Sequence, residues 1–199
     1  MRRAIRQYGE PVLRAKGQRI KVVDQRIREL AADMLETMHA AQGVGLAAQQ
    51  VGEALQLTVI DVAEVEDRPS TLKINGVATA VIGAMPLILL NPEVALGAEI
   101  TTGVEGCLSF PEISADIDRS ESVVVRAQTM ENAPILIEAT GLLARALQHE
   151  VDHLNGILFV DRMSSALKVS LAGKLKRLQK ETKSGEGKGR VSRAGQRAL

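Results

Sequence analysis

The chain has 199 residues, which is enough for one domain of ordinary size with its own core and too few for two. Apolar residues make up 45% of the chain but aromatic residues only 2%, which argues against recognition of nucleic-acid bases by stacking on aromatic rings. The net charge of +1 hides an asymmetry: residues 168–199 contain ten Lys/Arg and two Asp/Glu, a balance of +8, so residues 1–167 carry −7. We therefore expect an acidic domain with a basic extension and no sequence-specific binding of nucleic acid.

The cysteine content and the N-terminal sequence indicate in which cellular compartment the protein is expected, a reducing one. The single cysteine, Cys107, leaves no internal disulfide and is typical of a reducing environment, in which a thiol can bind a metal. The first residues are basic but lack the apolar run of a signal peptide, and no segment reaches roughly 18 uninterrupted apolar residues. We expect a cytoplasmic protein that does not interact with a membrane.

The first predicted element is a helix that ends near Gln42. Asp24 can cap its N-terminus, and its apolar residues recur at the spacing of one buried helical face. These residues are Ile27, Leu30, Ala31, Met34, Leu35 and Met38.

Two strands follow, over residues 55–62 and 86–94. Residues 63–85 between them are predicted to form a long loop or an added hairpin around Asn75 and Gly76, because Asn-Gly is a typical hairpin turn.

The next segment is predicted to be an antiparallel hairpin of residues 121–128 and 133–139, followed by a helix with Thr140 as a candidate cap and Gly156 as a candidate terminator. Apolar residues recur at helical spacing between those two: Leu142, Leu143, Ala146, Leu147, Val151 and Leu154. The mixture of helices and antiparallel strands predicts an α+β fold with this helix at its centre.

The C-terminal part is predicted to contain a short strand at ILFVD (157–161) and then a last helix. We expect a catalytic domain over 1–163, a basic helix over 164–183 and a disordered basic tail over 184–199.

The stretch QHEVDHLNG contains His149 and His153, which lie on one face of the predicted helix and can bind the same ion, with Glu150 beside them. The alternative is an ordinary helix that happens to contain two histidines. The third histidine, His39, has no partner at ligand spacing, and we interpret it as structural.

Cys107 lies in the loop-like segment EGCLS. A free cysteine taken alone is more often a small buried hydrophobic residue than a ligand. Together with the two histidines, however, it supplies three donors and leaves a fourth position open, which is the arrangement of a catalytic metal site.

The glycine-rich segment GVGLAAQQ contains Gly43 and Gly45, which let the backbone approach another surface closely, and Gln50, whose amide can donate to an oxygen. Such a segment can also be no more than a turn. It is not a phosphate-binding P-loop, because no Lys-Ser/Thr follows the glycines.

In this order, GVGLAAQQ, EGCLS and QHEVDH together resemble the three motifs of the peptide deformylase family, and the resemblance extends over about residues 8–163. It implies a metallohydrolase that removes the formyl group from N-formylmethionine at the start of nascent polypeptides. The roles implied are metal ligation by Cys107, His149 and His153, general base and acid catalysis by Glu150, and oxyanion binding by Gln50 and the N–H of Leu108.

The resemblance also implies residues around these groups. Those expected to bind substrate are Gly43, Val44, Gly45, Gly103, Leu142, Arg145 and Ala146. Those expected to support the ligands are Glu105, Gln148 and Asp152, of which Asp152 is expected to pair with an arginine such as Arg119 and not with the ion.

The chain departs from the family pattern in three places. Residues 63–85 make it longer than compact bacterial members, and Ser114 replaces an arginine that some relatives carry. Gly103 and Arg145 stand where many members have aliphatic residues that line the methionine pocket, so the shape of that pocket is the feature most in question.

The resemblance implies one divalent ion per chain, Fe(II) in the cell, with Zn, Ni or Co accepted in a purified sample. Implied partners are formyl-Met nascent peptides and, through a basic C-terminal helix like that of some relatives, the ribosome.

Two other functions are compatible with parts of the pattern. A zincin-type metallopeptidase shares His-Glu-x-x-His but takes its third ligand downstream, where Asp161 is the one close carboxylate. A non-enzymatic module stapled by a metal needs four protein ligands, and the sequence has no fourth Cys or His placed to close such a site.

Overall fold

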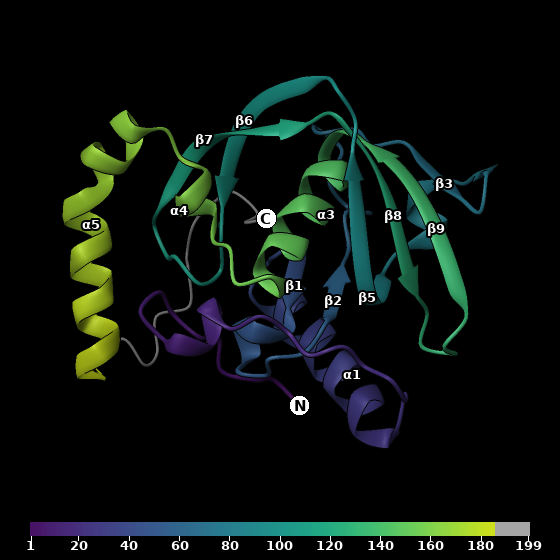
Figure 1. Ribbon diagram of the computed structural model, residues 1–199, viewed down its shortest axis with the longest axis horizontal. Coiled ribbons are helices and arrows are strands. Elements are labelled where there is room, and N and C mark those ends of the chain that lie inside the picture. The colour runs from purple at the N-terminus through teal and green to yellow at the C-terminus, as the bar shows by residue number, and fades with distance from the viewer. Residues whose placement is uncertain (186–199) are drawn as a thin grey trace.

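In the computed structural model, which describes residues 1–185, the helix α3 (Gly141–Leu154) lies between two antiparallel sheets (Figure 1). All of its residues after Gly141 are buried. This arrangement confirms the predicted α+β fold with the His-Glu-x-x-His helix at its centre. Gly156 follows the helix with φ of +74°, as expected of a terminator, whereas Thr140 occupies the N-cap position without a capping bond and its hydroxyl instead contacts Thr71.

The larger sheet has seven strands in the order β1-β2-β5-β8-β9-β3-β4. Every neighbouring pair is antiparallel, and alternate aliphatic side chains of β8 and β9 pack on α3 in one core cluster. The strands are β1 (Gly45–Ala47), β2 (Leu57–Ile60), β3 (Leu72–Ile74), β4 (Val77–Ala78), β5 (Leu87–Leu96), β8 (Ser122–Gln128) and β9 (Pro134–Thr140).

The segment 63–85 contains the hairpin that Asn75-Gly76 predicts. Both turn residues have positive φ, 51° and 82°, as a two-residue hairpin turn requires. Strand β3 pairs with β9, so the hairpin extends the edge of the larger sheet, and a single helical turn, α2 (Val81–Ala84), follows it.

The N-terminal helix α1 (Gln25–Ala40) begins as predicted, with the Asp24 carboxylate accepting a bond of 2.9 Å from the N–H of Ile27. Its buried face packs on β1 and β2. Two short 3₁₀ turns, η1 (Pro11–Arg14) and η2 (Ala48–Val51), complete this part of the molecule.

The smaller sheet consists of β6 (Ile100–Gly106) and β7 (Ser114–Ser120), which the sequence pattern did not predict. It lies on the side of α3 opposite the larger sheet (Figure 1). Cys107 follows β6 directly, so this hairpin decides where the sulfur lies.

The predicted strand at ILFVD is wrong. Phe159 begins a single helical turn, α4 (Phe159–Arg162), and the Asp161 carboxylate accepts a bond of 2.8 Å from the N–H of Leu158. Phe159 and Val160 are buried there, so the apolar run reflects a core contact and not a strand.

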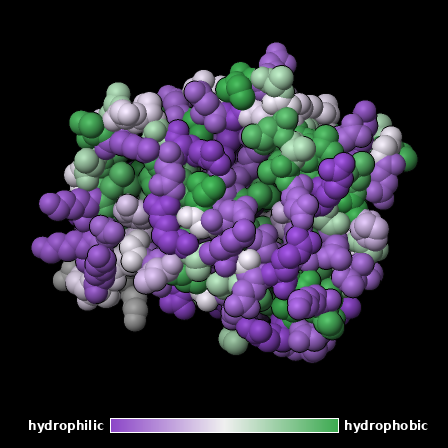
Figure 2. All heavy atoms as spheres, in the orientation of Figure 1, coloured by the Kyte–Doolittle hydropathy of each residue, from purple (hydrophilic) through white to green (hydrophobic). Residues whose placement is uncertain are grey.

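The last helix, α5 (Ser165–Ser184), lies along one side of the molecule (Figure 1). Four leucines pack partly against the core cluster that contains Cys107, Phe110 and Phe159, whereas Ala166 is exposed. Hydrophilic residues project from the side of the molecule where α5 lies (Figure 2). The four leucines are Leu167, Leu171, Leu175 and Leu178.

Within residues 1–185 there is no helix long and apolar enough to cross a membrane. Of the expected disordered tail over 184–199, Ser184 is instead the last residue of α5 and Gly185 caps that helix, and the remainder lies outside the described residues.

Candidate metal centre and active site

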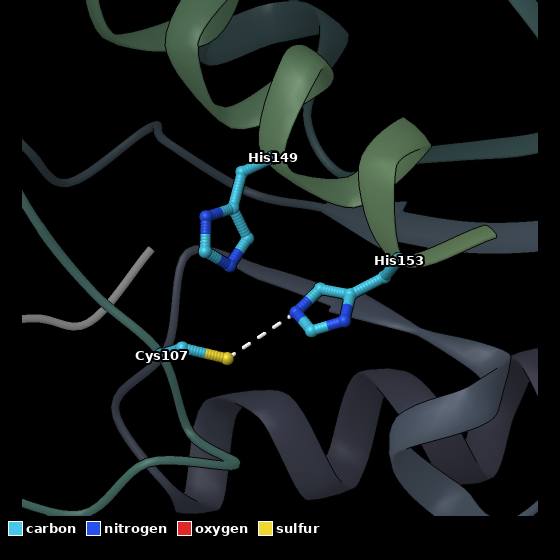
Figure 3. Close-up of side chains that lie close together, drawn as sticks. All are labelled: Cys107, His149 and His153. Atoms are coloured by element: carbon cyan, nitrogen blue, oxygen red, sulfur yellow. Dashed lines mark hydrogen bonds between the residues drawn. The ribbon is translucent and has the colours of Figure 1, made fainter. Parts of the chain in front are cut away.

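Cys107, His149 and His153 converge on one point although they come from two distant segments (Figure 3). Their ligand atoms lie within 4.8 Å of one another, and Cys107 Sγ is 3.2 Å from His153 Nε2. All three side chains are buried, and His149 Nε2 has no hydrogen-bond partner among the described residues. A sulfur and two imidazoles, with an unpartnered nitrogen among them, fit a divalent metal ion with an open position.

Glu105 fixes the orientation of His149. Its Oε2 lies 3.0 Å from His149 Nδ1, so that Nε2 faces Cys107 and His153. Arg119 donates to both carboxylate oxygens, over 2.9 and 3.0 Å. Burial alone would raise the pKa of Glu105, but the hydrogen bonds with His149 and Arg119 outweigh it and hold that pKa well below its usual range. Glu105 is therefore an anion at the back of the site.

The two other residues expected to support the ligands lie further out. Asp152 accepts hydrogen bonds from Arg119 and Arg162, which confirms the expected pairing with an arginine. The Gln148 amide accepts from the N–H of Ser120 and donates to its carbonyl, so these hydrogen bonds connect α3 to β7.

Glu150 is fully buried, and neither carboxylate oxygen has a hydrogen-bond partner among the described residues. Burial raises the pKa of Glu150 to about 7. A carboxylate in this state can both accept and return a proton near neutral pH.

Gly45 allows β1 to pass directly over this carboxylate, because a Cβ at this position would lie 2.3 Å from Glu150 Oε1. Gly43 similarly leaves room for the Leu108 side chain, 2.8 Å from its hypothetical Cβ. The close approach predicted for the two glycines is therefore confirmed.

Gln50 is held on both sides of its amide. Its Oε1 accepts a bond of 2.8 Å from the N–H of Ala47, and its Nε2 faces Cys107 Sγ at 3.5 Å and Ser109 Oγ at 3.3 Å. The donor end of the amide thus points to the metal centre. Ser109 was not singled out from the sequence, although it is the last residue of EGCLS and is fully buried.

The residues expected to bind substrate fall into two groups. Val44, which lies between Gly43 and Gly45 in the chain, shares one core cluster with Leu142 and Ala146. The other group is Gly103 and Arg145: the Arg145 guanidinium is buried and hydrogen-bonds to Glu105 and to backbone carbonyls of β6 and β7. Contact of either group with a substrate stays a prediction. Ser114 begins β7 and is exposed.

Among residues 1–185, the one group that could hold a metal does not include the downstream carboxylate that a zincin-type centre would need. Asp161 binds Arg14 and the N–H of Leu158. His39 is half exposed, lies 3.0 Å from Asp61 and is not one of the three residues that could hold a metal ion.

The fold and the site together are those of a metal-dependent hydrolase that combines an upstream cysteine with a His-Glu-x-x-His helix. A family model described as polypeptide deformylase matches residues 2–169, and the chain belongs to this family.

Curated relatives and solved structures agree with this assignment. A peptide deformylase of Opitutus terrae is 42% identical over 88% of this chain and 92% of its own length, and one of Methylacidiphilum infernorum is 44% identical over 87% and 90%. The crystal structure of peptide deformylase 1B of Arabidopsis thaliana with an inhibitor matches with a TM-score of 0.78 and 33% identity, over 94% of this chain and 97% of that one. The Thermotoga maritima peptide deformylase matches with a TM-score of 0.70 and 36% identity, over 82% and 99%.

Proposed function

We propose that Glu150 is the general base and general acid with which this chain removes the N-formyl group from formylmethionine at the start of nascent polypeptides. The observation that carries these roles is a fully buried carboxylate with no hydrogen-bond partner among the described residues, next to His149 in the sequence and with its pKa raised to about 7. A water placed between Glu150 and the formyl carbon would give a proton to the carboxylate as its oxygen bonds to that carbon. When the C–N bond then breaks and formate is released, Glu150 would return this proton to the departing amine.

Cys107, His149 and His153 would hold the divalent ion, which we expect to be Fe(II) in the cytoplasm and Zn, Ni or Co in a purified sample. When bound, such an ion supplies Lewis acidity that lowers the pKa of water and stabilises negative charge. Glu105 holds His149 in the tautomer that presents Nε2 to this site.

Gln50 and the backbone N–H of Leu108 are the proposed donors to the formyl oxygen as it gains negative charge. The amide of Gln50 is already fixed by the N–H of Ala47, so its Nε2 needs no reorientation during the reaction. Donors held in place before the reaction stabilise a developing oxyanion by a few kcal/mol.

The direct test is hydrolysis of formyl-Met-Ala-Ser with and without a chelator, for the wild type and Glu150→Gln. An amide cannot accept the proton, so Glu150→Gln should lose about 10²–10⁴-fold in kcat while it retains the metal. Glu131→Gln, at an exposed position, is the matched control and should keep full activity. Full turnover by Glu150→Gln would remove this residue from the mechanism.

We also propose that α5 docks the enzyme on the ribosome. Its leucines face the domain, so its basic residues are exposed: Lys168, Lys174, Lys176, Arg177, Lys180 and Lys183. Neutralisation of RNA phosphates by these residues would release counterions, so the association should weaken steeply with salt and show little sequence preference.

Truncation after Met163 and after Lys183 tests this proposal by co-sedimentation with ribosomes at low and moderate salt. We expect the longer deletion to abolish association while turnover of formyl-Met-Ala-Ser persists. Unchanged association in both truncations would show that the C-terminal segment is not the docking element.

A further inference from the structure

The Arg145 side chain forms hydrogen bonds with both strands next to the metal centre, which a side chain that only lines a substrate pocket would not require. It lies on α3 one turn before His149 and is only 6% exposed. Its guanidinium donates over 2.8–2.9 Å to one carboxylate and two carbonyls, and over 3.4 Å to a third carbonyl. These acceptors are Glu105 Oε1, Ile117 O, Thr101 O and, at 3.4 Å, Gly103 O, and the hydroxyl of Thr101 is a fifth acceptor at 3.5 Å.

Gly103 provides the space that the guanidinium occupies. A Cβ on Gly103 would lie 3.1 Å from Arg145 Nη2, 3.2 Å from its Cζ and 3.4 Å from its Nε. The end of a free side chain could move away, but this one is held by five acceptors on β6 and β7. A side chain at position 103 and the present position of Arg145 are therefore in conflict.

These contacts join the two segments that carry the proposed ligands. Strand β6 contains Gly103 and Glu105 and leads into Cys107, whereas α3 carries His149 and His153. A buried guanidinium is costly unless its donors are satisfied, so the positions of β6 and β7 on α3 are tied to the bonds of Arg145. Without Arg145, Glu105 would still have Arg119 and His149 as partners. The role of Arg145 is therefore to align β6 and β7 with α3, in addition to neutralising the charge of Glu105.

We infer that Gly103 and Arg145 act as one unit that positions β6 on α3 and thereby places Cys107 at ligand distance from His149 and His153. This inference rests on the proposed role of those three residues as metal ligands. Arg145 is a positioning residue, because it acts through the strand that leads to Cys107 and through Glu105.

The test is a double-mutant cycle with Gly103→Ala and Arg145→Met, measured with zinc alone and with cobalt. Zinc affinity is determined by competition with a chelator, and the sulfur-to-cobalt charge-transfer band reports whether Cys107 binds the ion. Arg145→Met should weaken zinc binding about 10–100-fold, the usual effect of losing an outer partner of a metal site. Gly103→Ala should weaken it several-fold in the wild type and should have no further effect in Arg145→Met, because the obstructing guanidinium is gone.

Gly83→Ala is the matched control, since a Cβ there meets nothing within 4 Å. If Arg145→Met does not fold, Arg145→Lys replaces it, because an ammonium group cannot reach Glu105 and the carbonyls of both strands at once. Wild-type zinc affinity and an unchanged cobalt band in the Arg145 variant would overturn the inference, as would an equal effect of Gly103→Ala in both backgrounds. A wild type that binds cobalt through Cys107 but hydrolyses no formyl peptide would refute the proposed function and leave this inference standing.

Discussion

Gly45 lies where the backbone of β1 passes over the Glu150 carboxylate. The sequence indicated only that a glycine here permits a close approach, and the structure identifies the group approached. A methyl group at this position would overlap Oε1 and lie 2.8 Å from Cδ of Glu150. The carboxylate is the movable partner, so its position will change before the backbone does.

Gly45→Ala should therefore reduce kcat on the order of 10²-fold, because a displacement of about 1 Å of a catalytic group has this effect. The thermal midpoint and the metal content should change little, since the ligands remain in place. Gly83→Ala serves as the control substitution in the same assay of formyl-Met-Ala-Ser. Wild-type kcat for Gly45→Ala would mean that Glu150 does not need its present position.

At the scale of elements, the ion pair between Arg14 and Asp161 connects η1 to α4. Arg14 Nη2 is 3.1 Å from Asp161 Oδ1, and both side chains are partly exposed, at 46% and 40%. Burial would raise the pKa of Asp161, but the bonds from Arg14 and from the N–H of Leu158 outweigh it, and Lys168 adds attraction, so the pKa lies below its usual value.

A carboxyl group whose pKa is lower in the folded than in the unfolded state stabilises the fold above its unfolded pKa, and this contribution is lost as the pH falls through the folded pKa. Asp161→Asn should therefore lower the free energy of unfolding by about 0.2–1 kcal/mol at pH 7, the range for exposed pairs. The difference from the wild type should shrink below pH 3.8, the ordinary pKa of this group. Urea unfolding of both proteins at pH 7 and pH 3 measures it, and a difference that grows at low pH would contradict the assignment.

The elements that were predicted correctly are those formed by interactions between residues close together in the sequence. Helices α1 and α3 were predictable because the apolar period of a helix and its cap are local. The hairpin of β6 and β7 was not, because β6 contains two glycines and SADIDRS is largely polar, so neither segment has a clear apolar strand pattern, and their position depends on contacts with α3. The ILFVD error has the same origin: a short apolar run does not distinguish a strand from a buried turn.

At the scale of the whole molecule, the proposed ion would join segments 42 residues apart in the chain, from Cys107 to His149. A ligand that binds only the folded state raises the free energy of unfolding, by about 2.7 kcal/mol when its concentration is 100 times Kd. Metal binding should therefore stabilise the molecule beyond the active site.

Removal of the metal with a chelator should lower the midpoint of thermal unfolding of the wild type, and zinc should restore it. Cys107→Ala should show a much smaller shift, because two imidazoles alone bind the ion weakly. Glu150→Gln, which keeps all three ligands, is the control and should respond like the wild type. Scanning calorimetry provides the measurement, and equal shifts for Cys107→Ala and the wild type would remove Cys107 from the ligand set.

The sequence by itself determined the class of fold, the helix that carries His149 and His153, the three motifs and the family they indicate. These features were accessible because each is encoded within a few consecutive residues, by helical spacing, capping and donor chemistry.

Only the tertiary structure decided how the motifs meet. It placed the Cys107 sulfur beside the two imidazoles, the backbone of Gly45 against Glu150, and the Arg145 guanidinium among Glu105 and the carbonyls of β6 and β7. The physical reason is that buried charged and polar groups need hydrogen-bond partners, and here those partners come from segments far apart in the sequence. A local sequence pattern does not show which distant residue will be the partner.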